Sequence, residues 1–176
     1  ARVGLAFDND DLPVISFNGA SKRVYIAYDP LFPTGAVKDE SRLVSAGETM
    51  LDDGFVTGPV RFVKEGGGTL IRDGAATNTY GTLVAEGTLV VRNPTAVSTG
   101  PLEIARVAAV VVEPPNNLLN SALSVDELRL DPAGQLEIGL GRIEIGAEGI
   151  TEAELRQAIA TGRGDGDWNG SGGITS

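Results

Sequence analysis

Short apolar runs separated by glycine, asparagine and proline organise this chain, most regularly over residues 62–102. Within that stretch the triplet Gly-Thr-Leu recurs at Gly68, Gly81 and Gly87, and each leucine opens a run in which apolar and polar positions alternate. Alternation with a period of two predicts β-strands. Strands this short cannot bury a face alone, so the pattern predicts copies stacked on one another.

The strand pattern continues after residue 102. Further short runs lie at residues 102–104, 107–112, 123–125, 127–130, 135–138 and 142–145. The unbroken apolar run at residues 108–112 is typical of a strand that is buried on both faces. The later runs keep apolar residues at a spacing of two, which predicts successive rungs of one stack.

The first 33 residues have a different pattern. Val3, Leu5 and Phe7 share one face of a predicted strand, and two further strand-like runs at residues 14–17 and 23–28 flank Asn18-Gly19. An Asn-Gly turn between two such runs predicts a β-hairpin. The N-terminal portion is therefore expected to be antiparallel and to differ from the rest.

One helix is expected near the C-terminus. Thr151 can cap it, and Glu154 lies three residues later, as in a capping box. An apolar stripe at helical spacing follows, formed by Leu155, Ala158 and Ile159. Gly162 can provide the left-handed stop. Such a helix covers the exposed end of a strand stack, or alternatively binds a partner.

These elements predict an all-β chain in three parts. Residues 1–59 form a β-rich N-terminal portion, either a hairpin or an assembly strand; residues 60–150 form a β-solenoid; and residues 151–176 form a capping helix with a Gly/Asp-rich tail. At 176 residues the chain is long enough to bury roughly 70% of its unfolded surface.

Composition narrows the classes of function. The net charge is −10, and the three lysines are scattered, which disfavours a nucleic-acid partner. The chain has no cysteine and no histidine, so it has no disulfide framework and lacks the commonest general base. Aromatic residues are only 5%, so the core must be aliphatic. No apolar run reaches the roughly 18–20 residues of a membrane span.

The residues 62–102 resemble the autotransporter-associated β-strand repeat of large bacterial surface and secreted proteins. The matching positions are Lys64, Gly66, Gly68-Thr69-Leu70, Gly74, Asn78-Thr79-Tyr80, Gly81, Val84 and Gly87-Thr88-Leu89. The sequence departs from that pattern where Gly81 directly follows Tyr80, and where Arg72-Asp73 replaces small polar residues. The resemblance implies a right-handed parallel β-helix with a passenger, stalk or scaffold role, and it carries over no catalytic residue.

The C-terminal segment Trp168 to Ser176 is similar to a module that follows such repeats in exported bacterial proteins, where it precedes a sorting or anchoring tail. Together the two resemblances cover residues 60–176 and imply a secreted or cell-surface bacterial location. The chain begins at Ala1 rather than at methionine, which fits either a removed export signal or artificial trimming.

Two acidic segments are candidate calcium sites. Asp165, Asp167 and Asn169 match the first half of a calcium loop, because oxygen ligands at alternate positions followed by glycine suit Ca²⁺. The twelfth position is Ser176 instead of glutamate, so a turn with Trp168 packed on the last coil is the competing interpretation. A second cluster, of Asp8, Asp10 and Asp11, is either a charged loop or a contact for calcium or a partner.

A polysaccharide-active enzyme is the catalytic alternative. It needs two carboxyl groups flanking a groove, usually with aromatic residues that stack on sugars. The available acids on predicted strands are Glu103, Glu113, Glu137 and Glu144, most of them at outward positions. With three tyrosines and one tryptophan, a stacking platform is scarcely available. We therefore expect no enzyme and no cofactor apart from the calcium candidate.

The sequence thus predicts an extracellular structural protein that self-associates into a fibre, a surface layer or an adhesin stalk. The ends of a strand stack expose unpaired backbone groups, which must be capped or joined to another chain. The expected partner is the chain itself, with a surface polysaccharide as a second possibility. The alternatives are a calcium- or carbohydrate-binding module and a polysaccharide-active enzyme.

Overall fold

A computed structural model describes residues 3–7, 13–17, 37–113, 122–139, 141–146 and 149–176 of the chain. The chain divides into two compact units, Ala1–Ala36 and Val37–Ser176. In the first unit, β1 (Val3–Phe7) pairs antiparallel with β2 (Pro13–Phe17). This pair differs from the predicted hairpin, which joins residues 14–17 to residues 23–28. The hairpin predicted across Asn18-Gly19 and the acidic cluster at residues 8–11 lie outside the described residues.

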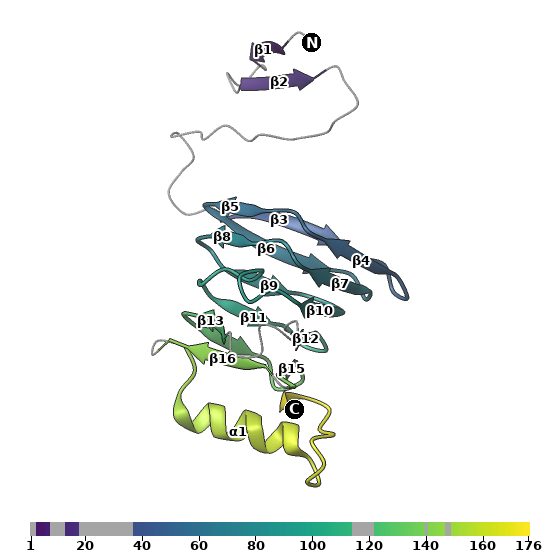
Figure 1. Ribbon diagram of the computed structural model, residues 1–176, viewed down its shortest axis with the longest axis vertical. Coiled ribbons are helices and arrows are strands. Elements are labelled where there is room, and N and C mark those ends of the chain that lie inside the picture. Colours follow the sequence, from purple (N-terminus) through teal and green to yellow (C-terminus); the bar gives the residue numbers. More distant parts are fainter. Residues whose placement is uncertain (1–2, 8–12, 18–36, 114–121, 140, 147–148) are drawn as a thin grey trace. The chain divides into compact units, whose positions relative to one another are not determined.

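The second unit is a right-handed parallel β-solenoid of about five coils, which confirms the predicted fold class (Figure 1). Its first sheet stacks β3 (Lys38–Leu43), β6 (Val60–Glu65), β9 (Thr82–Val84), β11 (Leu102–Ile104) and β14 (Leu128–Leu130). Its second sheet stacks β4 (Thr49–Asp52), β7 (Thr69–Arg72), β10 (Thr88–Val91), β12 (Ala109–Val112), β15 (Gln135–Glu137) and β17 (Gly173–Thr175). The third face carries two parallel pairs, β5 (Val56–Gly58) with β8 (Ala76–Asn78), and β13 (Ala122–Val125) with β16 (Arg142–Ile145).

The core consists of columns of inward side chains that run along the stack. The longest column lies in the second sheet and contains Met50, Leu70, Leu89, Val110, Leu136 and Ile174. All of these except Met50 are buried. Each strand contributes alternate residues to such a column, because successive side chains of a strand point to opposite faces. This is the continuous aliphatic core that the low aromatic content required.

The solenoid begins before residue 60, where the sequence placed its start. β3, β4 and β5 already form a complete coil, because each pairs in parallel with its counterpart in the next coil. The sequence pattern was hard to interpret here since the inward positions of β3 include Glu40 and Arg42 instead of aliphatic residues. The boundary between the two units therefore falls between Ala36 and Val37.

The run at residues 108–112 is not buried on both faces, which corrects the sequence interpretation. In β12, Val110 and Val112 are buried, whereas Ala109 and Val111 are half-buried and point outward. A solenoid strand has one inward face, so the alternate side chains lie on the outer surface of the coil.

The predicted capping helix is confirmed as α1 (Glu152–Arg163). The Thr151 hydroxyl accepts a hydrogen bond from the Glu154 N–H, and the Glu154 carboxylate accepts one from the Thr151 N–H at 2.9 Å. The helix ends two residues later than predicted, because its C-cap is Gly164 and not Gly162. Gly162 is buried within the helix instead, where a Cβ would overlap the Ile174 carbonyl oxygen.

Candidate functional site

The first coil ends the solenoid with three strand edges. β3, β4 and β5 each pair on one side only, with β6, β7 and β8 respectively. Among the residues that the structure describes, no strand pairs with their other sides. Free N–H and C=O groups along such an edge form a template for another strand. This coil, residues 37–58, is called the open coil below.

The opposite end of the stack is covered. In the second sheet, β17 continues the stack by pairing with β15. The helix α1 packs against β17, and Leu155 and Ala158 on it contact the core together with Ile150. Figure 1 shows the helix lying across this end of the stack, as predicted for a cap. The other residue of the predicted apolar stripe, Ile159, is 37% exposed.

Several apolar side chains of the open coil are exposed. Met50 belongs to the long core column, yet it is 40% exposed, whereas Leu70 beneath it is fully buried. The column is therefore left uncovered at this end. Further exposed apolar side chains of the same coil are Val37, Leu43, Leu51 and Phe55. A cluster of this kind on one end of a molecule indicates an interaction surface.

Charged side chains take the place of aliphatic ones on the inner side of the open coil and its neighbour. Arg42 on β3 contacts Glu40 at 2.8 Å and Asp52 at 3.0 Å. Arg72 on β7 contacts the same Asp52 oxygen at 2.8 Å, and its side chain is only 1% exposed. Glu40, Arg42, Asp52 and Arg72 are called the inner charge cluster below. Arg72 is the buried member of this cluster and Glu40, Arg42 and Asp52 are partly exposed, so pairing matters most for Arg72, whose charge would be strongly destabilising without a partner.

Phe62 ties the inner charge cluster to the core. Two guanidinium groups lie over its ring, with Arg72 at 4.8 Å and Arg42 at 5.8 Å from the ring centroid. Both distances fall within the range of cation–π attraction. In the column that contains Phe62 the residues change from Glu40 at the open end to Leu102 and Leu128 at the capped end. The interior thus becomes more polar toward the open coil.

The charge balance affects the protonation of Asp52. Burial alone would raise the pKa of this carboxyl group, but the Gly54 N–H at 2.9 Å and the two arginines stabilise the carboxylate. The net effect is a pKa below the ordinary value of aspartate. The ionised form is therefore the one that holds the two arginines together.

Lys64 is the second fully buried cation. Its ammonium group donates hydrogen bonds to the carbonyl oxygens of Glu65, Gly66 and Glu86, at 3.1, 2.5 and 2.9 Å. Burial lowers the pKa of this amine. Because Glu86 lies in the next coil, the ammonium group links two successive coils through their turns.

The sequence interpretation missed the inner charge cluster, although one signal was present. Arg72-Asp73 was noted only as a departure from the repeat pattern. Arg72 occupies the inward position two residues after Leu70, which placed an arginine in the predicted core. The partner, Asp52, follows from the stacking of β4 on β7 and not from sequence spacing.

The three calcium candidates lie in the turn after α1. The side chains of Asp165, Asp167 and Asn169 are exposed. The turn is closed by hydrogen bonds from the N–H groups of Gly166 and Trp168 to the Arg163 carbonyl oxygen, at 3.0 and 3.2 Å. Across the described residues, no three His, Cys, Asp or Glu side chains are placed to hold a metal ion. The calcium site stays a prediction. Trp168, which the competing interpretation packs against the last coil, is 39% exposed.

The carboxylates considered for sugar hydrolysis lie on the outer surface of the coils. Glu113, Glu137 and Glu144 are exposed, and Glu103 is half-buried. Glu113 lies 3.7 Å from Arg92, and Glu144 pairs with Arg142 on its own strand. These acids come from different faces of the solenoid, so the topology does not gather them around one groove.

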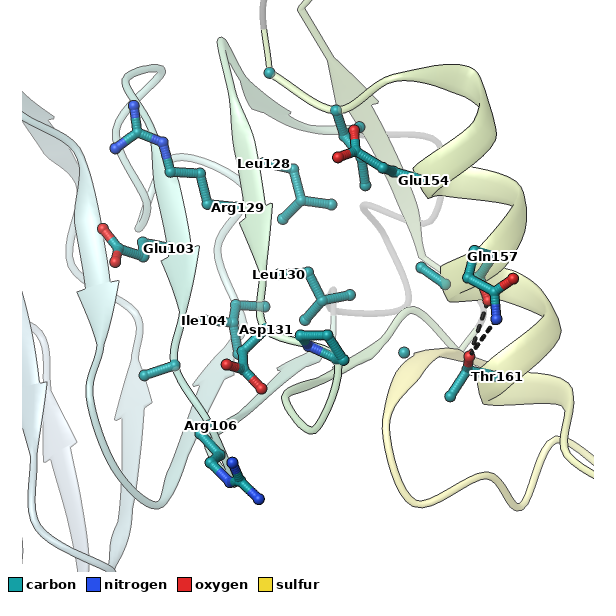
Figure 2. Close-up of a pocket in the computed structure, with 16 residues that line it drawn as sticks. Glu103, Ile104, Arg106, Leu128, Arg129, Leu130, Asp131, Glu154, Gln157 and Thr161 are labelled. Carbon is teal, nitrogen blue, oxygen red and sulfur yellow. Dashed lines mark hydrogen bonds between the residues drawn. The ribbon is translucent and has the colours of Figure 1, made fainter.

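A groove of about 690 Å³ lies between the first sheet and α1. Figure 2 shows Leu128 and Leu130 of β14 on one wall and Glu154, Gln157 and Thr161 of the helix on the other. Glu103, Arg106, Arg129 and Asp131 lie along the side of the groove formed by the sheet. The groove thus combines an apolar wall with charged groups of both signs, as small-molecule sites commonly do.

Comparison of the chain with protein-family models, with curated proteins and with solved structures gives no match. None of the described helices is long and apolar enough to cross a membrane. The functional conclusions therefore come from the geometry of this chain.

Proposed function

We propose that this chain is an extracellular structural protein, a subunit or segment of a self-associating surface assembly such as a fibre, a surface layer or an adhesin stalk. The observation that carries this proposal is the asymmetry of the two ends of the stack. The last coil is covered by α1 and β17, whereas in the part of the chain that the structure describes no strand pairs with the outer edges of the first coil, and its Met50 is exposed. Association through that end covers both.

The architecture suits a structural role. Each coil pairs with its neighbours along the stack, as in other repeat architectures. The resemblance to autotransporter-associated repeats supports a secreted or cell-surface bacterial location, and it stays a hypothesis. The net charge of −10 repels copies from one another at long range, so association has to depend on local pairing at the open coil.

Light scattering and negative-stain microscopy of the full chain over a range of concentrations test this proposal. We expect species larger than one chain, with a mass that rises with concentration. A monodisperse monomer at every concentration tested would contradict the proposal.

A proline substitution on the outer edge of β3 gives a variant in which only strand pairing at that edge is blocked. The Val44 N–H bonds to Glu65 of β6, so by strand alternation the backbone groups of Ser41 point away from β6. Ser41→Pro therefore removes an edge donor without removing a hydrogen bond inside the solenoid. We expect this variant to keep its circular dichroism spectrum and to shift toward monomer.

Ligand binding is a second candidate function, favoured by the groove beside α1. Its mixed apolar and charged lining fits a carbohydrate or another small polar ligand. A glycan array with calorimetric confirmation checks this, with Gln157→Trp as a variant that fills the groove from an exposed position of the helix. Binding that survives this variant would place the ligand elsewhere.

A further inference from the structure

The longest edge of the open coil is β3, and its side chains alternate in a defined way. Glu40 and Arg42 lie opposite Phe62 and Lys64 of β6, both of which are buried. They therefore point inward, together with Lys38. The alternate residues Asp39, Ser41 and Leu43 point outward and are exposed.

A second copy of this chain is the occupant that the geometry favours for this edge. The capped end has no matching surface, because α1 covers it. The open coil of another copy does match, since among the described residues it has the same three edges without a paired strand and the same exposed Met50. Two identical surfaces that meet are related by a two-fold axis, which closes the assembly at that end. The two β3 strands then run antiparallel.

The alternation of side chains restricts the register of such a pair. In an antiparallel pair, residues directly opposite each other point to the same face. Inward residues must therefore lie opposite inward residues. This requires one residue of β3 to lie directly opposite its own copy, with the two-fold axis midway between the two.

Charge selects among these residues. An axis at Glu40 places the two Glu40 carboxylates opposite each other, and axes at Asp39 or Arg42 likewise oppose identical charges. An axis at Ser41 places Glu40 of each copy opposite Arg42 of the other, so it forms two ion pairs. The Ser41 N–H is directed at the outer edge of β3, as a hydrogen-bonded pair about the axis requires. The Ser41 carbonyl oxygen accepts a hydrogen bond from Arg42 Nη1 at 3.1 Å, which the N–H of the second copy would replace.

We propose that two copies of this chain join head to head, with their β3 strands antiparallel about Ser41 and with Glu40 of each copy paired to Arg42 of the other. This arrangement rests on the proposed self-association and names its partner and register. It covers the exposed Met50 column of both copies. It also joins two solenoids into one closed pair with a helix-capped end at each extremity, so a fibre or layer of such pairs would require a further contact outside the open coil.

A single cysteine on the axis tests the register, because the natural chain has no cysteine. Antiparallel hydrogen-bonded pairs have Cα atoms about 5.5 Å apart, within the range that a disulfide spans. In the full chain, we expect S41C to form a covalent dimer under mild oxidation at least about tenfold faster than S124C, which places the thiol on an exposed residue of β13. Non-reducing electrophoresis measures both rates.

A charge reversal gives an independent measurement. E40K places like charges opposite each other at both ends of the pair, so we expect the dimer dissociation constant to rise at least about tenfold. Circular dichroism checks that this variant is folded, and E137K, a charge reversal at an exposed residue of β15, should leave dimerisation unchanged.

The outcomes separate the two proposals. If S41C cross-links no faster than S124C while the protein is oligomeric, the head-to-head register is overturned and the self-association stands. If the wild-type chain is a monomer throughout, both fail.

Discussion

At the scale of single residues, the distinctive feature is a set of charges buried inside a β-solenoid. Arg72 and Lys64 are as buried as the leucines of the core, and each is held in a different way, although Arg72 Nε has no hydrogen-bond partner. Arg72 pairs with a carboxylate, whereas Lys64 bonds to three carbonyl oxygens. A buried ion pair stabilises little against an apolar replacement, but removal of one partner is costly. These side chains should therefore be sensitive to single substitutions.

Arg72→Ala is expected to lower the free energy of unfolding by about 3–5 kcal/mol, because it leaves Asp52 without its closest partner in a buried site. The control is Arg92→Ala, since Arg92 is exposed and lies 3.7 Å from an exposed Glu113. That substitution should cost no more than about 1 kcal/mol. Urea denaturation measures both, and equal effects would mean that the Asp52 pair contributes nothing particular.

Stability should fall in acid partly through Asp52. Its pKa in the folded chain is lowered, so the ionised carboxylate is favoured in the folded state. This contribution is fully present above the ordinary aspartate pKa of about 3.9 and is lost as the pH falls through the lower folded value. Melting temperatures between pH 6 and pH 2.5 should therefore drop less steeply in Asp52→Asn than in the wild type. Parallel curves for the two proteins would disprove this assignment.

The calcium hypothesis is also tested at the scale of single residues. If Asp165, Asp167 and Asn169 bind Ca²⁺, millimolar calcium should raise the melting temperature by mass action, and the variant D165N/D167N should lose that increase. Scanning calorimetry with and without a chelator measures it. No increase in the wild type would leave the segment as a turn.

At the scale of elements, similar sequence runs take different roles according to the sheet they join. The triplets at Gly68 and Gly87 are equivalent, since Leu70 and Leu89 stack in one inward column. The triplet at Gly81 lies in the first sheet, where Thr82 and Val84 point inward and Leu83 points outward. A shift of one residue reverses which side chains are buried. Gly81 itself has a φ of 74°, and a Cβ there would overlap the Pro101 backbone, which accounts for the glycine directly after Tyr80.

The contact between α1 and β17 depends on a glycine inside the helix. By helix propensity alone, Gly162→Ala should stabilise the chain by about 1 kcal/mol. Because the added Cβ would overlap the Ile174 carbonyl, we expect it to destabilise the chain instead. Ala160→Gly, at an exposed position of the same helix, should cost about 1 kcal/mol by propensity. Thermal denaturation distinguishes the two, and a stabilised Gly162→Ala would mean that α1 sits farther from β17.

At the scale of the whole second unit, the interior of the stack changes from charged at the open coil to apolar at the end that α1 covers. Leu102, Leu128 and Leu136 fill the interior near α1, whereas the inner charge cluster fills it at the open coil. Charged side chains at an exposed edge are a common protection against uncontrolled strand pairing. In the proposed head-to-head pair, the same side chains select a single register.

Removal of the helical cap should change the assembly. Leu155→Asp with Ala158→Asp places charges where α1 meets the core, so the helix should detach and expose the edges of β14 and β16. We expect this variant to form larger and more heterogeneous species by light scattering. Ile159→Asp, on the exposed side of the same helix, should behave as the wild type. An unchanged mass distribution in the double variant would show that the cap does not limit growth.

The sequence by itself determined the class of fold and the cap. Period-two runs too short to fold alone predict stacked strands, and the Thr151–Glu154 capping box marks the helix start, because both signals are local. Only the tertiary structure decided which residues face inward and where the stack begins. Those properties depend on which strands pair, as for Arg72 with Asp52 and for β3 with β6. Pairing between coils joins residues about twenty apart, so no local pattern could reveal that charged side chains take inward positions of β3 and β4, beside the buried Val44 and Val56 of the same coil.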